Sequence, residues 1–308
     1  GDVYKRQVTS IPSFAQFTIN GRSVIYDKVS DTYMVSIPEN AFGTDYEASI
    51  ALDATAGWSN LSIEGTDIAD NYTFKQVEGN KIYKIHAQEG DKEINTQLTF
   101  TFLPLLVMEG TFGYSYAQGN ISLLSPDAAE PTNSFAKVKW RGGTTNTADK
   151  HKRNYKIKTL NEKGKKQEIS LLGMREDNNW ILDAGQIDLF RLRNRIATEI
   201  WNDFATKPYY ASKEPKVKSG VTGKVVEVIL NNEYRGIYSL TEAMDRKELK
   251  LKKYDDKNQE FHGQLWKVSS WDKATFWDID KDYDNTQETW HAFETKYPDI
   301  EDVNPTDY

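Results

Sequence analysis

The segment Ala136-Lys137-Val138-Lys139-Trp140-Arg141-Gly142-Gly143 decides the fold that we expect for the second half of the chain. Its first five residues alternate with a period of two, which is typical of a strand, and the strand runs directly into an Arg-Gly-Gly turn. A second predicted strand, Tyr155-Lys156-Ile157-Lys158, follows the connecting residues 144–154. On that strand Lys156 and Lys158 project to the same face, because successive side chains alternate between faces. The sequence therefore predicts two lysines beside a flexible turn.

The surrounding stretch, Lys150–Gln167, is strongly basic. It holds eight Lys or Arg residues and one acid, Glu162, in a chain whose formal net charge is −7. Glycines let backbone N–H groups approach a ligand closely, and ammonium groups offset negative charge. The residues that we consider for a polyphosphate site are Arg141, Gly142, Gly143, Lys156 and Lys158. The alternative is a solvated edge strand whose lysines deter aggregation.

Residues 8–105, on the N-terminal side, have the pattern of an all-β domain. Short alternating runs such as Gln16–Ile19 and Gln97–Phe102 are separated by turn formers such as Asn20-Gly21. Several strands at this spacing, with no helical pattern between them, indicate a β-sandwich of immunoglobulin-like type. We interpret this domain as a spacer or a binding module, because nothing in it resembles a catalytic cluster.

Residues 106–308 have a mixed pattern, so the fold class that we expect for the chain is α+β. A helix is predicted from about Asp188 to Phe204, and a hairpin over Val225–Leu230 and Gly236–Leu240. The paired residues Asn231-Asn232 suit the positive φ angles of a tight hairpin turn.

One arginine of the predicted helix has an unusual place. Steps of about 100° per residue from Phe190 put Arg193 in the middle of an apolar stripe. The other members of the stripe are Ala197, Ile200, Trp201 and Phe204. A buried unpaired charge is costly, so Arg193 must meet a carboxylate, a phosphate or backbone carbonyls. Both a structural ion pair and a direct ligand contact fit this position.

Composition excludes several classes of function. Without cysteine there is no disulfide, no cysteine zinc site, no iron–sulfur cluster and no thiol nucleophile. The 39 basic and 46 acidic residues argue against general nucleic-acid binding. No apolar run approaches the roughly 20 residues of a transmembrane helix.

The sequence contains no convincing metal site. Asp278–Asp284 resembles a calcium loop, but Tyr283 stands where the turn glycine belongs, so a solvated acidic loop is the ordinary interpretation. The histidines show no zinc-site spacing. They are His86, His151, His262 and His291.

The two ends of the chain also carry information. The first segment, Gly1–Gln7, matches what a common transposase sequencing adapter gives when it is translated, so we leave it out of fold reasoning. We expect the chain to be a fragment whose parent protein continues past Tyr308. The sequence gives no information about a signal peptide.

Taken in order, these segments resemble the N-terminal part of the CotH kinase family, atypical protein kinases named for a spore-coat protein. Ala136–Gly143 resembles the family's strand and R-G turn, and Lys152–Lys158 resembles its basic strand. Trp180–Leu182 and Leu192–Asn194 match its W-x-L motif and its R-N helix. Asn232–Glu242 matches its N-G-x-Y-x-G-x-Y-x-L-x-E hairpin, and Gly263–Lys267 is similar to the strand that follows. The resemblance covers roughly Leu103 to Tyr308. The preceding β domain resembles those found on such proteins from gut Bacteroidetes.

The resemblance implies ATP- and Mg²⁺-dependent transfer of the γ-phosphate to Ser or Thr of a protein. It also implies a kinase-like two-lobed fold, of which this chain holds mostly the N-lobe, and a secreted or cell-surface location. Arg141, Gly142 and Gly143 would cover the phosphates, and Lys156 or Lys158 would pair with them. The hairpin that ends at Glu242 would approach the adenine. Arg193 would tie its helix to a carboxylate such as Asp183 or Glu242.

The sequence departs from the family at the catalytic residues. The family's D-x-x-x-x-N loop and W-D-x-D motif follow a helical region, and we find neither beyond Tyr297-Pro298-Asp299. We treat Trp277-Asp278-Ile279-Asp280 as a coincidence, because it precedes that region. We therefore assign no catalytic or metal-binding residue and expect an inactive fragment. The alternative function is a non-enzymatic cell-surface adhesin on a kinase-like scaffold, which the many Trp and Tyr residues would suit.

Overall fold

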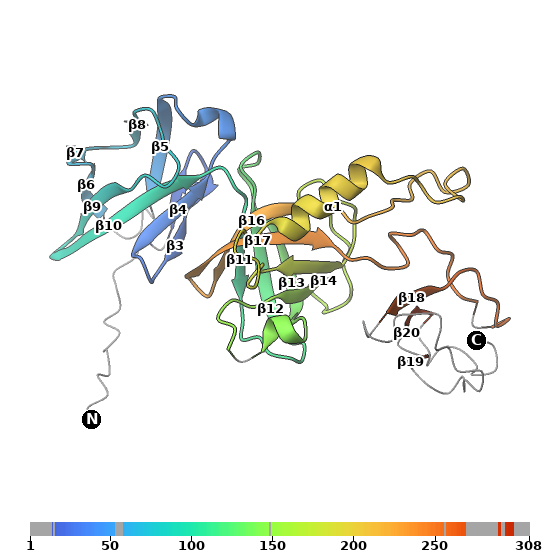
Figure 1. The fold of residues 1–308 in the computed structure, drawn as a ribbon. Coiled ribbons are helices and arrows are strands. Elements are labelled where there is room, and N and C mark those ends of the chain that lie inside the picture. The colour runs from blue at the N-terminus through green and yellow to red at the C-terminus, as the bar shows by residue number, and fades with distance from the viewer. Residues whose placement is uncertain are drawn as a thin grey trace. The chain divides into compact units, whose positions relative to one another are not determined.

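The structure is a computed structural model, and strands dominate it (Figure 1). It describes residues 14, 16–52, 58–147, 149–255, 257–268, 289–290 and 293–298. The chain divides into two compact units. The first comprises Gly1–Arg193 with Gly223–Thr241, and the second comprises Asn194–Thr222 with Glu242–Tyr308.

The N-terminal part of the first unit consists of two sheets with a common core. One sheet has the order β2-β1-β5-β8 and the other β3-β4-β10-β9-β6-β7. The strands are β1 (Phe17–Ile19), β2 (Arg22–Ser23), β3 (Ile25–Asp27), β4 (Thr32–Ser36), β5 (Tyr46–Leu52), β6 (Trp58–Ile63), β7 (Thr66–Asp67), β8 (Asn71–Phe74), β9 (Tyr83–Glu89) and β10 (Lys92–Thr101). Both sheets contribute to the core, because Ile19 and Phe74 come from the first and Phe100 from the second, and all three are fully buried. A short 3₁₀ helix, Glu39–Ala41, follows β4.

Seven further strands close into a barrel in the order β11-β12-β13-β14-β15-β17-β16. They are β11 (Leu105–Glu109), β12 (Ala117–Leu124), β13 (Thr132–Trp140), β14 (Tyr155–Leu160), β15 (Asn179–Asp183), β16 (Gly223–Leu230) and β17 (Glu233–Glu242). The barrel closes where β11 pairs with β16 in parallel, with Leu105 opposite Glu227. Inward side chains such as Val138, Ile157 and Trp180 fill its interior, as the period of two requires.

The predicted α+β fold class, with a kinase N-lobe in the second half of the chain, is wrong. The chain is mostly β, and α1 (Arg193–Phe204) is the single α-helix among the described residues. The pairing that turns the second half into a barrel joins β11 to β16, which lie far apart in the sequence. Local alternation of apolar residues predicts strands, but it does not show which distant strands pair.

The predicted helix also starts later than expected. The backbone N–H groups of Phe190 and Arg193 donate to the Asp188 carboxylate at 3.1 and 2.8 Å, and Arg191 adopts a φ of 63°. Asp188 therefore holds its neighbours in a turn that replaces the first helical turn.

The predicted hairpin is present as β16 and β17. Asn231 and Asn232 have φ angles of 51° and 60°, as a tight turn between antiparallel strands requires. The Asn231 side chain also exchanges two hydrogen bonds of 2.9 Å with the backbone of Gly110, just after β11. This turn is thus fastened to the neighbouring strand.

The second unit contains nearly all of α1 and a small sheet with the order β18-β20-β19. These strands are β18 (Leu265–Val268), β19 (Thr289–Trp290) and β20 (Phe293–Tyr297). Across the described ranges, no helix is long and apolar enough to cross a bilayer.

Candidate functional site at one end of the barrel

A half-buried lysine lies where a loop and a strand of the barrel meet. Lys152 precedes β14, and its ammonium group donates a hydrogen bond to the main-chain carbonyl of Ile237 in β17. The same ammonium lies 4.1 Å from the centre of the Tyr238 ring, which gives a cation–π contact. Gly236, which precedes Ile237, has a φ of 81°, and a Cβ atom there would only reach ordinary van der Waals contact with the Lys152 nitrogen, at 3.8 Å.

The surroundings of Lys152 disfavour its positive charge. Burial, and to a lesser extent the Arg191 charge, lower the pKa of Lys152 to about 8, while Asp183 acts in the opposite direction. A second anionic group near the ammonium would relieve this penalty, because an opposite charge favours the charged form. The position is therefore suited to an anionic ligand.

Two arginines hold the loops around Lys152. Arg153 stacks on the Trp140 ring at 4.6 Å and donates to the carbonyls of Asn146 and Thr147 at 2.7 and 2.5 Å. Arg191 donates to the carbonyls of Gly185 and Gln186 at 2.7 and 2.8 Å. We call Arg141, Lys152, Arg153 and Arg191 the cationic end of the barrel.

Asn154 joins two loops of this end. Its backbone carbonyl accepts from the Arg141 N–H at 2.9 Å, and its side chain donates to Thr145 at 3.2 Å. The side chain also accepts from the N–H of Ala184, which follows β15, at 2.6 Å. The loop after β13 and the loop after β15 are thus fixed to each other by one buried amide.

A second buried amide in the same loop, the side chain of Asn146, has no hydrogen-bond partner among the described residues. Asn146 ends the 3₁₀ helix Thr144–Asn146 and has no exposed surface, yet neither its side-chain nitrogen nor its oxygen forms a hydrogen bond within the described part of the chain. Buried amides are normally satisfied by protein or by water. Asn146 thus adds an unused donor and acceptor to this loop.

The Arg141-Gly142-Gly143 turn is exposed at the same end of the barrel as Lys152. Gly142 has a φ of 106°, and a Cβ atom there would lie 2.3 Å from the Thr145 hydroxyl, so only glycine fits. The Arg141 side chain forms no hydrogen bond or ion pair with any described residue. Contact of this turn with phosphate stays a prediction.

The predicted lysines of β14 lie on the outer face of the barrel. Lys156 and Lys158 are paired across the strands with Lys139 and Lys137 of β13, and the ammonium of Lys158 lies 4.8 Å from the centre of the Tyr116 ring. The edge-strand alternative is wrong, because β14 pairs with β13 on one side and β15 on the other. Their role at a phosphate stays a prediction.

Arg193 does not have the partner that we expected. Its Nε atom lies 3.2 Å from the Asp188 carboxylate, and its guanidinium lies 4.7 Å from the centre of the Phe190 ring. The side chain is 65% exposed, and the predicted apolar stripe is exposed as well. The buried arginine of the helix is Arg195, which pairs with Glu199 at 3.2 Å.

The carboxylate of Glu242 is fully buried at the end of β17. Both of its oxygens lie 3.1 Å from the Lys218 ammonium, and one accepts from the N–H of Thr222 at 2.8 Å. Glu242 therefore fastens β17 to the segment before β16. Proximity of this strand to adenine stays a prediction.

Lys152 is the residue that the sequence did not single out. It counted only as one of eight basic residues, because its contacts come from β17, whose sequence lies far from it. Gly236 in the middle of a predicted strand indicated an irregularity there, and the β16–β17 register does shift next to it, but this signal does not point to Lys152.

No metal centre is visible in the ranges that the structure covers, since no group of three or more Asp, Glu or His side chains gathers there. The segments Asp278–Asp284 and Trp277–Asp280 lie outside the described residues, as does Gly1–Gln7.

Comparison with known protein families assigns the second half of the chain. A family model described as CotH kinase protein matches residues 138–307, which is more than half of the chain. The match begins within β13 and includes the loop that carries Lys152. No curated protein matches the chain.

Proposed function

The chain belongs to the CotH kinase protein family, and we propose that it binds ATP with the triphosphate at the cationic end of the barrel. The reaction that this binding serves is transfer of the γ-phosphate to Ser or Thr of a protein. In phosphoryl transfer the protein chiefly positions groups and neutralises charge, so a cluster of fixed cations is the feature that the chemistry needs.

The observation that carries the proposal is the environment of Lys152. Its pKa is lowered to about 8, and Arg191 adds a second positive charge to the same place. Phosphate oxygens close to Lys152 would stabilise its charged form and accept its hydrogen bonds. A cation whose charged form is disfavoured in the free protein is typical of a binding site, because an anionic ligand then stabilises the charged form when it binds.

The neighbouring turn supports the same proposal. Arg141 has an unused guanidinium, and Gly142 keeps the backbone in a conformation that leaves the turn open. Together with Lys152, the turn would offer cations on one side of a triphosphate. Lys152 is a better candidate than Lys156 or Lys158 for the phosphate-pairing lysine, because the loops hold it at the same end as this turn.

Magnesium enters the proposal only as a partner of the nucleotide. When bound, it would neutralise charge on the phosphates, and Mg²⁺ often takes just one or two protein carboxylates. We assign it no residue of this chain.

The experiment compares ATP binding by wild type, Lys152→Ala and the control Lys165→Ala. Lys165 is an exposed lysine in the loop at the other end of β14. Isothermal titration calorimetry with ATP and Mg²⁺ should give at least about tenfold weaker binding for Lys152→Ala, the loss of one charge-assisted contact, and an unchanged value for the control.

Two results would contradict this proposal. One is the absence of ATP binding by the wild-type chain. The other is equal binding by wild type and Lys152→Ala. If Lys156→Ala or Lys158→Ala weakens binding while Lys152→Ala does not, the phosphate-pairing role returns to the strand lysines on the outer face of the barrel.

A further inference from the structure

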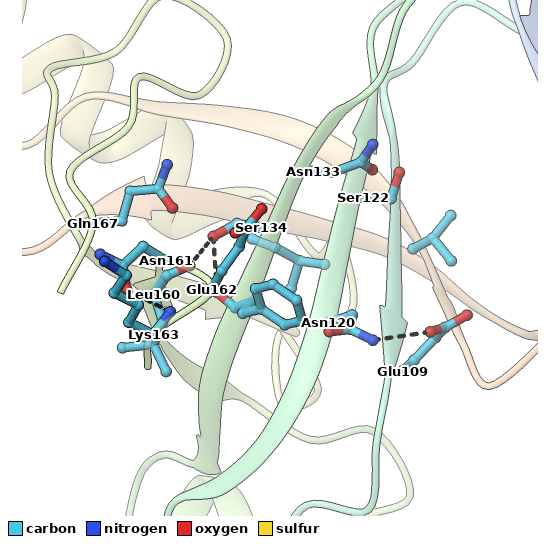
Figure 2. Close-up of a pocket in the computed structure, with 13 residues that line it drawn as sticks. Glu109, Asn120, Ser122, Asn133, Ser134, Leu160, Asn161, Glu162, Lys163 and Gln167 are labelled. Atoms are coloured by element: carbon cyan, nitrogen blue, oxygen red, sulfur yellow. Dashed lines mark hydrogen bonds between the residues drawn. The ribbon is translucent and has the colours of Figure 1, made fainter. Parts of the chain in front are cut away.

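A groove of about 820 Å³ lies on the outer face of the barrel, across β11, β12 and β13 (Figure 2). Two rows of side chains form its floor, as the strand register shows. One row is Glu109, Asn120, Phe135 and Leu160, and the other is Val107, Ser122 and Asn133. Its volume is typical of a site for a small molecule. We call it the Phe135 groove.

The loop Asn161–Gln167 forms one wall of the groove and is braced from within. The Asn161 carboxamide oxygen accepts from the N–H groups of Lys163 and Lys165, both at 3.0 Å. The Gln167 N–H donates to the Thr159 carbonyl at 3.1 Å, and the Gln167 carbonyl accepts from the Thr159 hydroxyl at 2.6 Å. The wall is therefore formed before any ligand arrives.

Neutral polar side chains in the groove have unused hydrogen-bonding capacity. The side chains of Ser122, Asn133 and Gln167 form no hydrogen bond with the described residues (Figure 2). The Asn120 amide has one long contact, 3.4 Å to Glu109. Each amide offers two donors and an acceptor, and the hydroxyl offers both. The groove thus presents several donors and acceptors without a charge.

An aromatic ring lies among these groups. Phe135 is 50% exposed, although it comes from a strand with partners on both sides. Asn120 lies directly opposite it on β12. A ligand with a flat apolar face and polar edges would cover the ring and meet the amides at the same time.

These features exclude the other common ligand classes. A peptide cannot add a strand here, because β12 and β13 each have two partners and offer no free edge. A purely apolar ligand would leave the amides without partners. The carboxylates of Glu109 and Glu162 outnumber the ammonium of Lys163, which disfavours an anionic ligand.

We propose that the Phe135 groove binds an uncharged oligosaccharide. A sugar ring has hydroxyl groups that donate and accept around its edge and a C–H face that packs on an aromatic ring, so it matches both features of the groove. The groove is separate from the cationic end, because its loop wall and the Arg141 turn lie at opposite ends of β14.

The test is saturation-transfer difference NMR with five neutral probes, which are tetraoses of cellulose, xylan, mannan, starch and chitin. At least one of them should receive saturation from the wild-type chain. Its affinity, measured by calorimetry, should weaken by about tenfold in Phe135→Ala and in Gln167→Ala. Gln167 is exposed and its fold contacts use the backbone, so this variant keeps the test valid if Phe135→Ala fails to fold.

The matched control is Phe102→Ala, since Phe102 is 46% exposed and does not line the groove. This control and Lys152→Ala should bind the sugar as wild type does. The proposal is overturned if none of the five probes binds, if Phe135→Ala and Gln167→Ala bind as well as wild type, or if an acidic oligogalacturonate or an extended peptide binds in their place.

Discussion

Lys152 donates a hydrogen bond to the main-chain carbonyl of Ile237, a residue 85 positions further along the chain. This bond joins the loop before β14 to the second strand of the hairpin. It also puts an ammonium group on the Tyr238 ring at 4.1 Å. One side chain thereby links the most basic stretch of the sequence to the strand that carries Gly236.

The lowered pKa of Lys152 makes a prediction for the pH dependence of stability. Between the folded-state value of about 8 and the ordinary value of 10.5, the unfolded chain holds a proton that the folded chain has released. The contribution of Lys152 to folding stability therefore rises with pH across this range, and wild type should gain stability relative to Lys152→Met as the pH increases. Urea denaturation at the two ends of the range measures the difference. The exposed control Lys165→Met should behave as wild type, and an equal pH dependence in Lys152→Met would refute the prediction.

Gly142 should tolerate no side chain. Its φ of 106° is unfavourable for any other residue, and an added Cβ atom would lie 2.3 Å from the Thr145 hydroxyl. We therefore expect Gly142→Ala to lose about 1–3 kcal/mol of stability. The control is Gly113→Ala, because a Cβ atom there meets nothing within 4 Å. Chemical denaturation measures both variants, and equal effects would show that the turn is not constrained in this way.

Replacement of Asn154 by alanine should destabilise the protein more than replacement of Asn133 by alanine. The Asn154 side chain bonds to Thr145 and to the Ala184 N–H, so Asn154→Ala leaves a buried donor without a partner and should cost about 1–3 kcal/mol. Asn133→Ala removes an exposed side chain that makes no hydrogen bond with described residues, and its effect should stay within about 0.5 kcal/mol. Thermal unfolding distinguishes them. A small loss in Asn154→Ala would mean that the two loops are held by other contacts.

Local signals in the sequence predicted individual strands well. The hairpin and its Asn231-Asn232 turn are present, because positive φ angles at two adjacent asparagines are a local requirement. The strands predicted at Ala136–Trp140 and Tyr155–Lys158 lie within β13 and β14, where a period of two separates core from surface.

The arrangement of those strands could not be predicted in the same way. Closure of the barrel depends on the parallel pairing of Leu105 with Glu227, and no local pattern encodes that pair. The site was missed for a similar reason. The contacts of Lys152 come from the hairpin, whereas Arg193, which the helical stripe singled out, is exposed and pairs with a local carboxylate, Asp188.

The last prediction concerns the relative folding stability of three variants at the buried carboxylate of Glu242. Lys218→Ala removes the ammonium that lies 3.1 Å from both carboxylate oxygens, while the Thr222 N–H continues to donate to the buried charge. Because Lys218 is 42% exposed, solvent screens the pair, and we expect a loss of about 2 kcal/mol, below the range for a fully buried pair. Glu242→Gln keeps the shape and an acceptor for Thr222, so its loss should be smaller. Adding Glu242→Gln to Lys218→Ala should then recover stability, because the double variant no longer buries a carboxylate charge that has lost the Lys218 ammonium. Urea denaturation of the three variants at neutral pH measures this order, and a double variant that is less stable than Lys218→Ala would show that the carboxylate is stabilised by groups other than Lys218.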